Sequence, residues 1–178
     1  IEVLRKKFNI PIVGIEPAIK PAMLETKTNN VGVLATEKTL SSNLFLKTSD
    51  RFSMGVKIHE QIGFDLVRII EENGINEELL TPKLKEYIEP MLEKNIDHLV
   101  LGCTHYYYLI CILKKILPSG VKILDSTQAV TKRVEYLLKD YNICSNALKA
   151  RDIFLCTGND HVINKFIGRG NKIDKITI

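Results

Sequence analysis

LVLGCTHYYYL, residues 99–109, runs from an apolar segment through one glycine into a cysteine, a threonine and a histidine. Apolar residues that end at a glycine are typical of a buried strand, and the apolar continuation after the histidine is typical of a helix. A thiol and an imidazole therefore stand at a strand-to-helix junction. Side chains at such junctions commonly bind ligands in α/β proteins.

The same alternation extends outward along the chain. Segments rich in Val, Ile and Leu predict strands at 10–16, 30–36, 98–103, 121–126, 152–157 and 172–178. Apolar residues at three- and four-residue spacing predict helices at 17–27, 39–52, 77–95, 106–117 and 127–141. Strands with little polar alternation are buried on both faces. We therefore predict an α/β fold with a parallel sheet covered by helices.

In such folds, ligands bind beyond the carboxyl ends of the strands. The residues that directly follow the predicted strands are rich in hydroxyl, thiol and acidic groups: Glu16-Pro17, Thr36-Glu37, Gly102 to His105, Asp125-Ser126 and Thr157 to Asp160.

Composition excludes several classes of function. A net charge of +4, with lysines spread along the chain, does not indicate nucleic-acid binding. The sequence has no apolar run of roughly 18 residues or more, so we expect no membrane span and no membrane partner. Four cysteines without a CxxC pair favour a reducing cytoplasm over a secreted disulfide framework.

Cys103 has three interpretations. A buried cysteine is most often an inert small hydrophobe, and this is our interpretation of Cys111, Cys144 and Cys156. At the start of a helix, however, backbone N–H groups favour a thiolate, and the neighbouring His105 can accept or donate a proton. A metal site at Cys103 and His105 would need further ligands, and none stands at a recognisable spacing. We therefore expect no metal.

Three motifs carry a resemblance to a known family. GIEPAIKPA (14–22), VGVLATEKTLSS (31–42) and LGCTH (101–105) resemble, in order and spacing, the aspartate/glutamate racemase superfamily, and most closely its branch that acts on glutamate. The resemblance implies cofactor-independent interconversion of L- and D-glutamate, which supplies bacterial peptidoglycan synthesis. Glutamate is then the expected substrate, with aspartate or hydantoin as alternatives, and a homodimer is left open.

The resemblance also implies an architecture of two flavodoxin-like parallel-sheet domains. Residues 23–128 would form one complete α/β domain. Residues 1–22 and 129–178 would belong to the other domain, which would be incomplete in this chain. The chain begins with Ile1 rather than Met, and we expect it to be a piece of a longer protein.

Site residues follow from the same motifs. Cys103 matches one of two catalytic cysteines of the family, the one that serves the L-enantiomer, and His105 matches the histidine that assists it. Thr104 matches a substrate-binding residue, and we expect His105 to bind substrate as well. Glu71, in LVRIIEENG, stands where the family has an assisting acid, although a solvated glutamate at a helix end explains it equally well. Thr36 and Thr39 match family threonines, with helix capping as an equal alternative.

The other catalytic cysteine of the family, in a Cys-Asn-Thr motif, has no counterpart in this sequence. We therefore expect one of the two catalytic thiols here, and an isolated chain that is inactive. A non-catalytic binding or regulatory domain of the racemase type is the alternative function.

Overall fold

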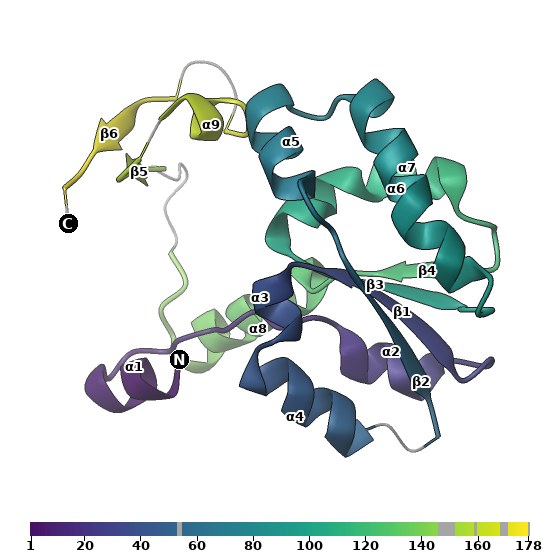
Figure 1. Ribbon diagram of the computed structural model, residues 1–178. Coiled ribbons are helices and arrows are strands. Elements are labelled where there is room, and N and C mark those ends of the chain that lie inside the picture. Colours follow the sequence, from purple (N-terminus) through teal and green to yellow (C-terminus); the bar gives the residue numbers. More distant parts are fainter. Residues whose placement is uncertain (53–54, 146–151, 159, 168–170, 178) are drawn as a thin grey trace.

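The computed structural model describes residues 1–52, 55–145, 152–158, 160–167 and 171–177. Its centre is a four-stranded parallel sheet in the order β2-β1-β3-β4 (Figure 1). The strands are β1 (Asn30–Ala35), β2 (Lys57–Ile62), β3 (His98–Gly102) and β4 (Lys122–Leu124). The parallel sheet that the apolar runs predict is thus confirmed, with β1 and β3 as its inner strands.

Both faces of the sheet are covered, because the inner strands are apolar on both sides. Val31, Val33 and Ala35 of β1 pack with one cluster of buried side chains. Leu34 of β1 and Leu99 of β3 pack with a second, larger cluster. Successive side chains of a strand point to opposite faces, so a continuous apolar run needs a helical layer on each side.

Helices supply these two layers. The first cluster is covered by α2 (Ile19–Glu25), α3 (Glu37–Leu40) and α4 (Asn43–Phe52). The second is covered by α5 (Leu66–Asn73), α6 (Glu77–Leu92), the 3₁₀ helix η1 (Thr104–Leu109) and α7 (Ile110–Ile116). Within the part of the chain that the structure describes, no helix has the length and apolar character needed to cross a membrane.

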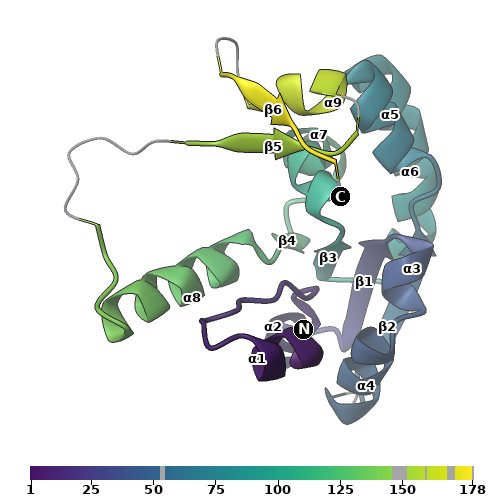
Figure 2. The same cartoon turned by 90° about the vertical axis from the view of Figure 1, so that its left-hand side faces the viewer.

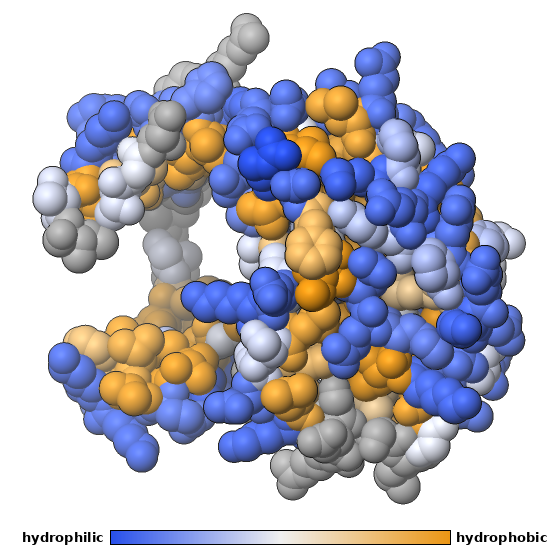
Figure 3. Space-filling view, viewed as in Figure 1, coloured by the Kyte–Doolittle hydropathy of each residue, from blue (hydrophilic) through white to orange (hydrophobic). Residues whose placement is uncertain are grey.

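The remaining elements extend to one side of this three-layer unit. They are α1 (Glu2–Lys7), α8 (Thr127–Asp140), β5 (Phe154–Cys156), α9 (Asp160–Asn164) and β6 (Ile173–Lys175). β5 and β6 form a separate two-stranded parallel pair that lies beside α9 and α5 (Figure 2). Figure 3 shows an opening between this pair and the segment with α1 and α8.

The division into domains at residues 22 and 128 stays a prediction. α2 begins before that boundary, and its Ile19 and Ala22 are both buried against the sheet.

Two strand predictions were wrong. Residues 10–16 belong to no strand, because none of them pairs with a strand among the described residues: Ile12 O accepts from the Arg5 side chain and Glu16 O from the Ser126 hydroxyl instead. β2 was missed, because KIHEQI at the edge of the sheet is polar and only half-buried. The predicted helix at 39–52 is two helices, α3 and α4, and the helix predicted from residue 106 begins two residues earlier as 3₁₀.

Asp97, directly before β3, joins this end of the sheet to the segment after α2. This is the end opposite to the predicted site. Its carboxylate accepts hydrogen bonds from the Thr26 hydroxyl (2.7 Å), from the backbone N–H groups of Lys27 (2.6 Å) and Thr28 (3.1 Å), and from His98 (2.8 Å). Burial raises the pKa of this carboxyl, but the hydrogen bonds outweigh burial and hold its pKa well below the ordinary value.

Asp97→Asn should therefore lower the free energy of unfolding by about 2 kcal/mol at neutral pH, because the charge-assisted bonds are lost. The folded-state pKa lies below the unfolded one, so this contribution is complete above about pH 4 and disappears as the pH falls further. Urea unfolding from neutral to acidic pH would measure it. The exposed Asp152→Asn is the matched control, and equal stability of the two variants at neutral pH would contradict this account.

Candidate active site

Close contact between the two inner strands brings the loops after them together. β1 and β3 pair in parallel with Ala35 opposite Gly102. A Cβ atom at Gly102 would lie 2.5 Å from the Ala35 Cβ, so only glycine fits at this point. Thr36 and Cys103, the next residue of each strand, therefore emerge side by side at the carboxyl edge of the sheet.

Three of the predicted residues form a connected row. Cys103 Sγ lies 4.0 Å from Nδ1 of His105, and Nε2 of His105 lies 3.0 Å from Glu71 Oε1. The side chains of His105 and Glu71 are 30% and 39% exposed, so this row is partly open to solvent. Glu71, at the end of α5, is thus a partner of His105 rather than an isolated glutamate at a helix end.

The row gives each nitrogen of His105 a defined role. A carboxylate at Glu71 accepts the Nε2–H, which leaves Nδ1 of the neutral ring as an acceptor that faces the thiol. This is the arrangement by which an oriented imidazole takes a proton from a nucleophile or a base. No group of three or more His, Cys, Asp or Glu side chains that could hold a metal ion occurs among the described residues.

The expected thiolate at Cys103 is not supported. Burial raises the pKa of the Cys103 thiol, and the nearby Glu71 charge raises it further, although backbone N–H groups of His105 and Tyr106 act in the opposite direction. The backbone donors at the start of η1 are present as expected, but desolvation outweighs them. Ionisation of Cys103 therefore needs a proton acceptor, and His105 is the adjacent one.

Alkylation of Cys103 by iodoacetamide should consequently follow a pH profile displaced to higher pH in the folded chain relative to the same chain in urea. The reason is that only the thiolate reacts and burial disfavours it. Rates at each cysteine would be read by peptide mapping, with the exposed Cys111 as an internal reference for reagent access. If the alkylation profile of Cys103 were displaced to lower pH on folding, the predicted thiolate would be supported instead.

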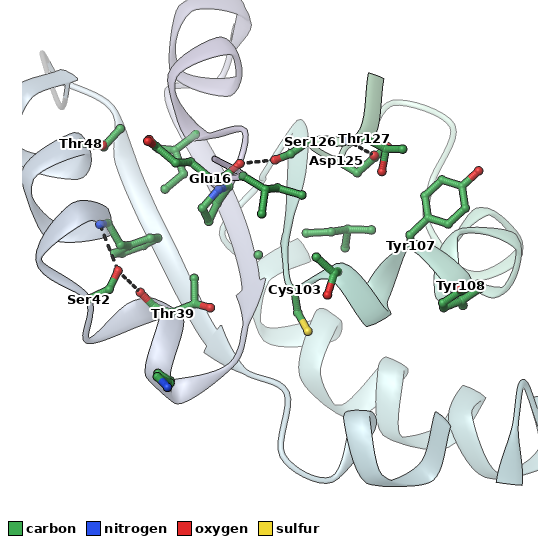
Figure 4. A pocket seen from close by; sticks show the side chains of 18 residues that line it. Glu16, Thr39, Ser42, Thr48, Cys103, Tyr107, Tyr108, Asp125, Ser126 and Thr127 are labelled. Carbon is green, nitrogen blue, oxygen red and sulfur yellow. Dashed lines mark hydrogen bonds between the residues drawn. The ribbon is translucent and has the colours of Figure 1, made fainter. Parts of the chain in front are cut away.

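A cavity of about 520 Å³ opens beside Cys103 (Figure 4). Thr39, on α3, lines one wall, and Cys103 and Tyr107 line the facing wall. Thr104 also lines the cavity. Strand-end residues predicted from the sequence also line it, namely Glu16, Asp125 and Ser126. The Ser126 hydroxyl donates to the backbone carbonyl of Glu16, which joins the segment before α2 to the start of α8.

Thr36 and Thr39 have different positions. Thr36 is the N-cap of α3: its hydroxyl oxygen accepts the N–H of Thr39 (3.3 Å) and lies 2.9 Å from the Thr39 hydroxyl. It lines a second, shallower cavity of about 410 Å³ together with Glu71. Only Thr39 reaches the cavity that contains Cys103. Capping, one of the two interpretations of Thr36, is therefore confirmed.

Sequence reasoning missed several residues that line the main cavity. None of them directly follows a strand, so the strand-end rule could not select them. Ser42 lies between α3 and α4, and the others lie inside helices: Lys38, Phe45, Thr48, Tyr107 and Tyr108. Of the predicted strand-end residues, Thr157, Gly158 and Asp160 do not line it, and Asn159 lies outside the described residues.

Comparison with known proteins identifies the family of the chain. A family model described as Asp/Glu/Hydantoin racemase matches residues 1–134. The chain belongs to this racemase family. The resemblance inferred from the three motifs is thereby confirmed.

Individual relatives of this racemase-family chain carry more specific names. It is 35% identical over 159 residues to a glutamate racemase of Ralstonia pickettii, covering 89% of this chain and 56% of that protein. It is 38% identical over 141 residues to a glutamate racemase of Ectopseudomonas mendocina, covering 79% and 54%. The chain thus spans little more than half the length of the curated relatives that it matches.

Solved structures of the racemase family show the same fold. Escherichia coli glutamate racemase, in complex with L-glutamate and the activator UDP-MurNAc-Ala, superposes with a TM-score of 0.79 at 27% identity. That match covers 99% of this chain and 69% of the other. Glutamate racemase isoform RacE1 of Bacillus anthracis gives the same TM-score at 26% identity. The α/β racemase fold expected from the sequence is therefore confirmed.

Proposed function

We propose that these residues are part of a glutamate racemase that works without a cofactor, with Cys103 as one of its two proton-transferring thiols. The observation that carries the proposal is the row from Glu71 through His105 to Cys103, which ends at a cavity of substrate size. Relatives named glutamate racemase support the choice of substrate. Thr104 and Thr39 are the proposed substrate-binding residues, and Thr36 fixes Thr39.

The proposed reaction begins with removal of a proton from the Cα of glutamate. His105 Nδ1 accepts the proton of the Cys103 S–H bond while Glu71 holds the Nε2–H. The resulting thiolate takes the Cα proton on one face, which forms S–H and leaves the electron pair on Cα. A second acid on the opposite face then forms the new C–H bond and inverts the centre.

Charges around the cavity match a glutamate zwitterion. Lys38 lines it beside Thr39, and a lysine ammonium can bind a carboxylate. Glu16 and Asp125 also line it (Figure 4), and either carboxylate can bind the substrate ammonium. Thr104 follows Cys103 at the start of η1, where its hydroxyl suits the second carboxylate.

The wider role remains part of the proposal. We place the protein in the cytoplasm, where D-glutamate would be made for peptidoglycan and cell-wall synthesis. Two domains, 23–128 and 1–22 with 129–178, would enclose the substrate between them. The alternative, a racemase-like binding or regulatory domain, draws on one observation: among the described residues, Cys103 is the only thiol that lines the cavity.

Titration of the ¹⁵N-labelled chain with L-glutamate tests the substrate assignment. The amide signals of Thr39, Cys103 and Thr104 should move, and Lys38→Gln should weaken the effect several-fold because one carboxylate loses its cation. Lys47→Gln, on an exposed residue of the next helix, is the matched control. Equal or larger changes with aspartate would reassign the substrate, and changes confined to residues outside the cavity would refute the site.

A further inference from the structure

The helix that carries Glu71 ends with backbone carbonyls that have no partner within the helix. Gly74 N–H donates to Ile70 O, which leaves the carbonyls after it for other donors. Lys165, far away in the sequence, supplies them: its Nζ donates to the carbonyl oxygens of Glu71 (2.7 Å) and Glu72 (2.5 Å). A lysine at this end also complements the helix dipole.

Phe166, the residue after Lys165, contacts η1, the helix that carries His105. The ring of Phe166 lies 4.6 Å, centroid to centroid, from the ring of Tyr108 on η1. Phe166 also packs against the large buried cluster. Figures 1 and 2 both show this part of the chain, after α9, beside the end of α5.

The opposite end of α5 is fixed independently. The Tyr106 hydroxyl donates to Gly63 O (3.0 Å) and the Tyr87 hydroxyl donates to Phe64 O (3.0 Å), both just before the helix. These bonds hold the start of α5, whereas Glu71 lies in its last turn. The position of the Glu71 carboxylate therefore depends on what holds the C-terminal turn.

We propose that Lys165 and Phe166 form a clamp that joins α5 to η1 and positions Glu71 against His105. Lys165 is then a positioning residue: it lies on the backbone of Glu71, acts through the hydrogen bond from Glu71 to His105, and sets which nitrogen of His105 faces Cys103. The catalytic importance of this clamp rests on the proposed function. Its effect on the positions of Glu71 and His105 can be tested without any substrate.

The test uses the 178-residue chain with ¹⁵N-labelled histidine at neutral pH. Chemical shifts of the two ring nitrogens show which one carries the proton, and a His105→Gln variant assigns the signals. In the unchanged chain, Nε2 should be the donor. In Lys165→Met the Nε2 and Nδ1 signals should move toward each other, because the ring no longer has a fixed acceptor for one proton. Lys165→Arg, which retains donors and charge, should restore the original signals.

Two further measurements separate positioning from general stability. Lys172→Met removes an exposed lysine from the same segment, where it pairs with Asp174, and should leave His105 unchanged. Amide hydrogen exchange in the last turn of α5 should become about tenfold faster in Lys165→Met only. Faster exchange with unchanged His105 signals would show a structural role alone and overturn the inference, as would unchanged exchange. Neither readout involves glutamate, so failure of the proposed function would not affect them.

Discussion

The 178-residue chain is expected to form no D-glutamate from L-glutamate. Inversion at Cα needs a base on one face and an acid on the other, each close to the carbon. Among the described residues Cys103 is the only thiol that lines the cavity, and the neighbouring side chains of His105 and Glu71 are 30% and 39% exposed to solvent. Water in the site weakens the electrostatic stabilisation that a carbanion requires.

Incubation in deuterated buffer, followed by chiral chromatography and mass spectrometry, distinguishes the outcomes. One-sided exchange would place deuterium on L-glutamate, slowly, without inversion. D-glutamate formed by the unchanged chain and not by Cys103→Ala would show that a second acid lies within these residues. That result would contradict the two-thiol assignment.

In a protein that contains these residues and racemises glutamate, Cys103→Ala should lower kcat by on the order of 10⁴-fold. Removal of the thiol deletes the group that transfers the proton on one face, and neither His105 nor Glu71, the other members of the row, lines the cavity. KM should change little, because substrate binding is assigned to the hydroxyls and to Lys38.

Cys111→Ala is the matched control, since Cys111 is an exposed thiol on α7 outside the cavity. Its racemisation rate should equal that of the unchanged protein. Similar losses in both variants would indicate a folding effect, which circular dichroism would reveal. Retained racemisation in Cys103→Ala would end the assignment of Cys103 as a catalytic residue.

The sequence was sufficient to predict the centre of the fold and of the site. β1 and β3 are uninterrupted apolar runs, and such strands are recognisable because burial on both faces leaves no room for polar residues. The junction from Gly102 to His105 was found because a parallel sheet concentrates function at strand ends. The resemblance alone singled out Glu71, and the structure places it 3.0 Å from His105.

The rest depends on contacts between distant residues, which local patterns do not contain. β2 is polar because it lies at an edge, and its pairing with β1 decides its conformation. The raised pKa of Cys103 comes from burial, a property of the packed structure rather than of the four residues GCTH. The contact from Lys165 to Glu71 joins residues 94 positions apart, a separation that no periodicity detects.

The segments that extend beyond the central sheet unit, with α1, α8, β5 and β6, affect how the chain behaves in solution. α8 has no buried residue, yet it exposes Val134 and Leu138, and among the described residues neither β5 nor β6 pairs with a further strand. Apolar side chains also gather over α1 (Figure 3). Uncovered strand edges and apolar helix faces promote aggregation. In concentrated solution the chain should self-associate through these surfaces. Light scattering should then increase with protein concentration and with kosmotropic salt.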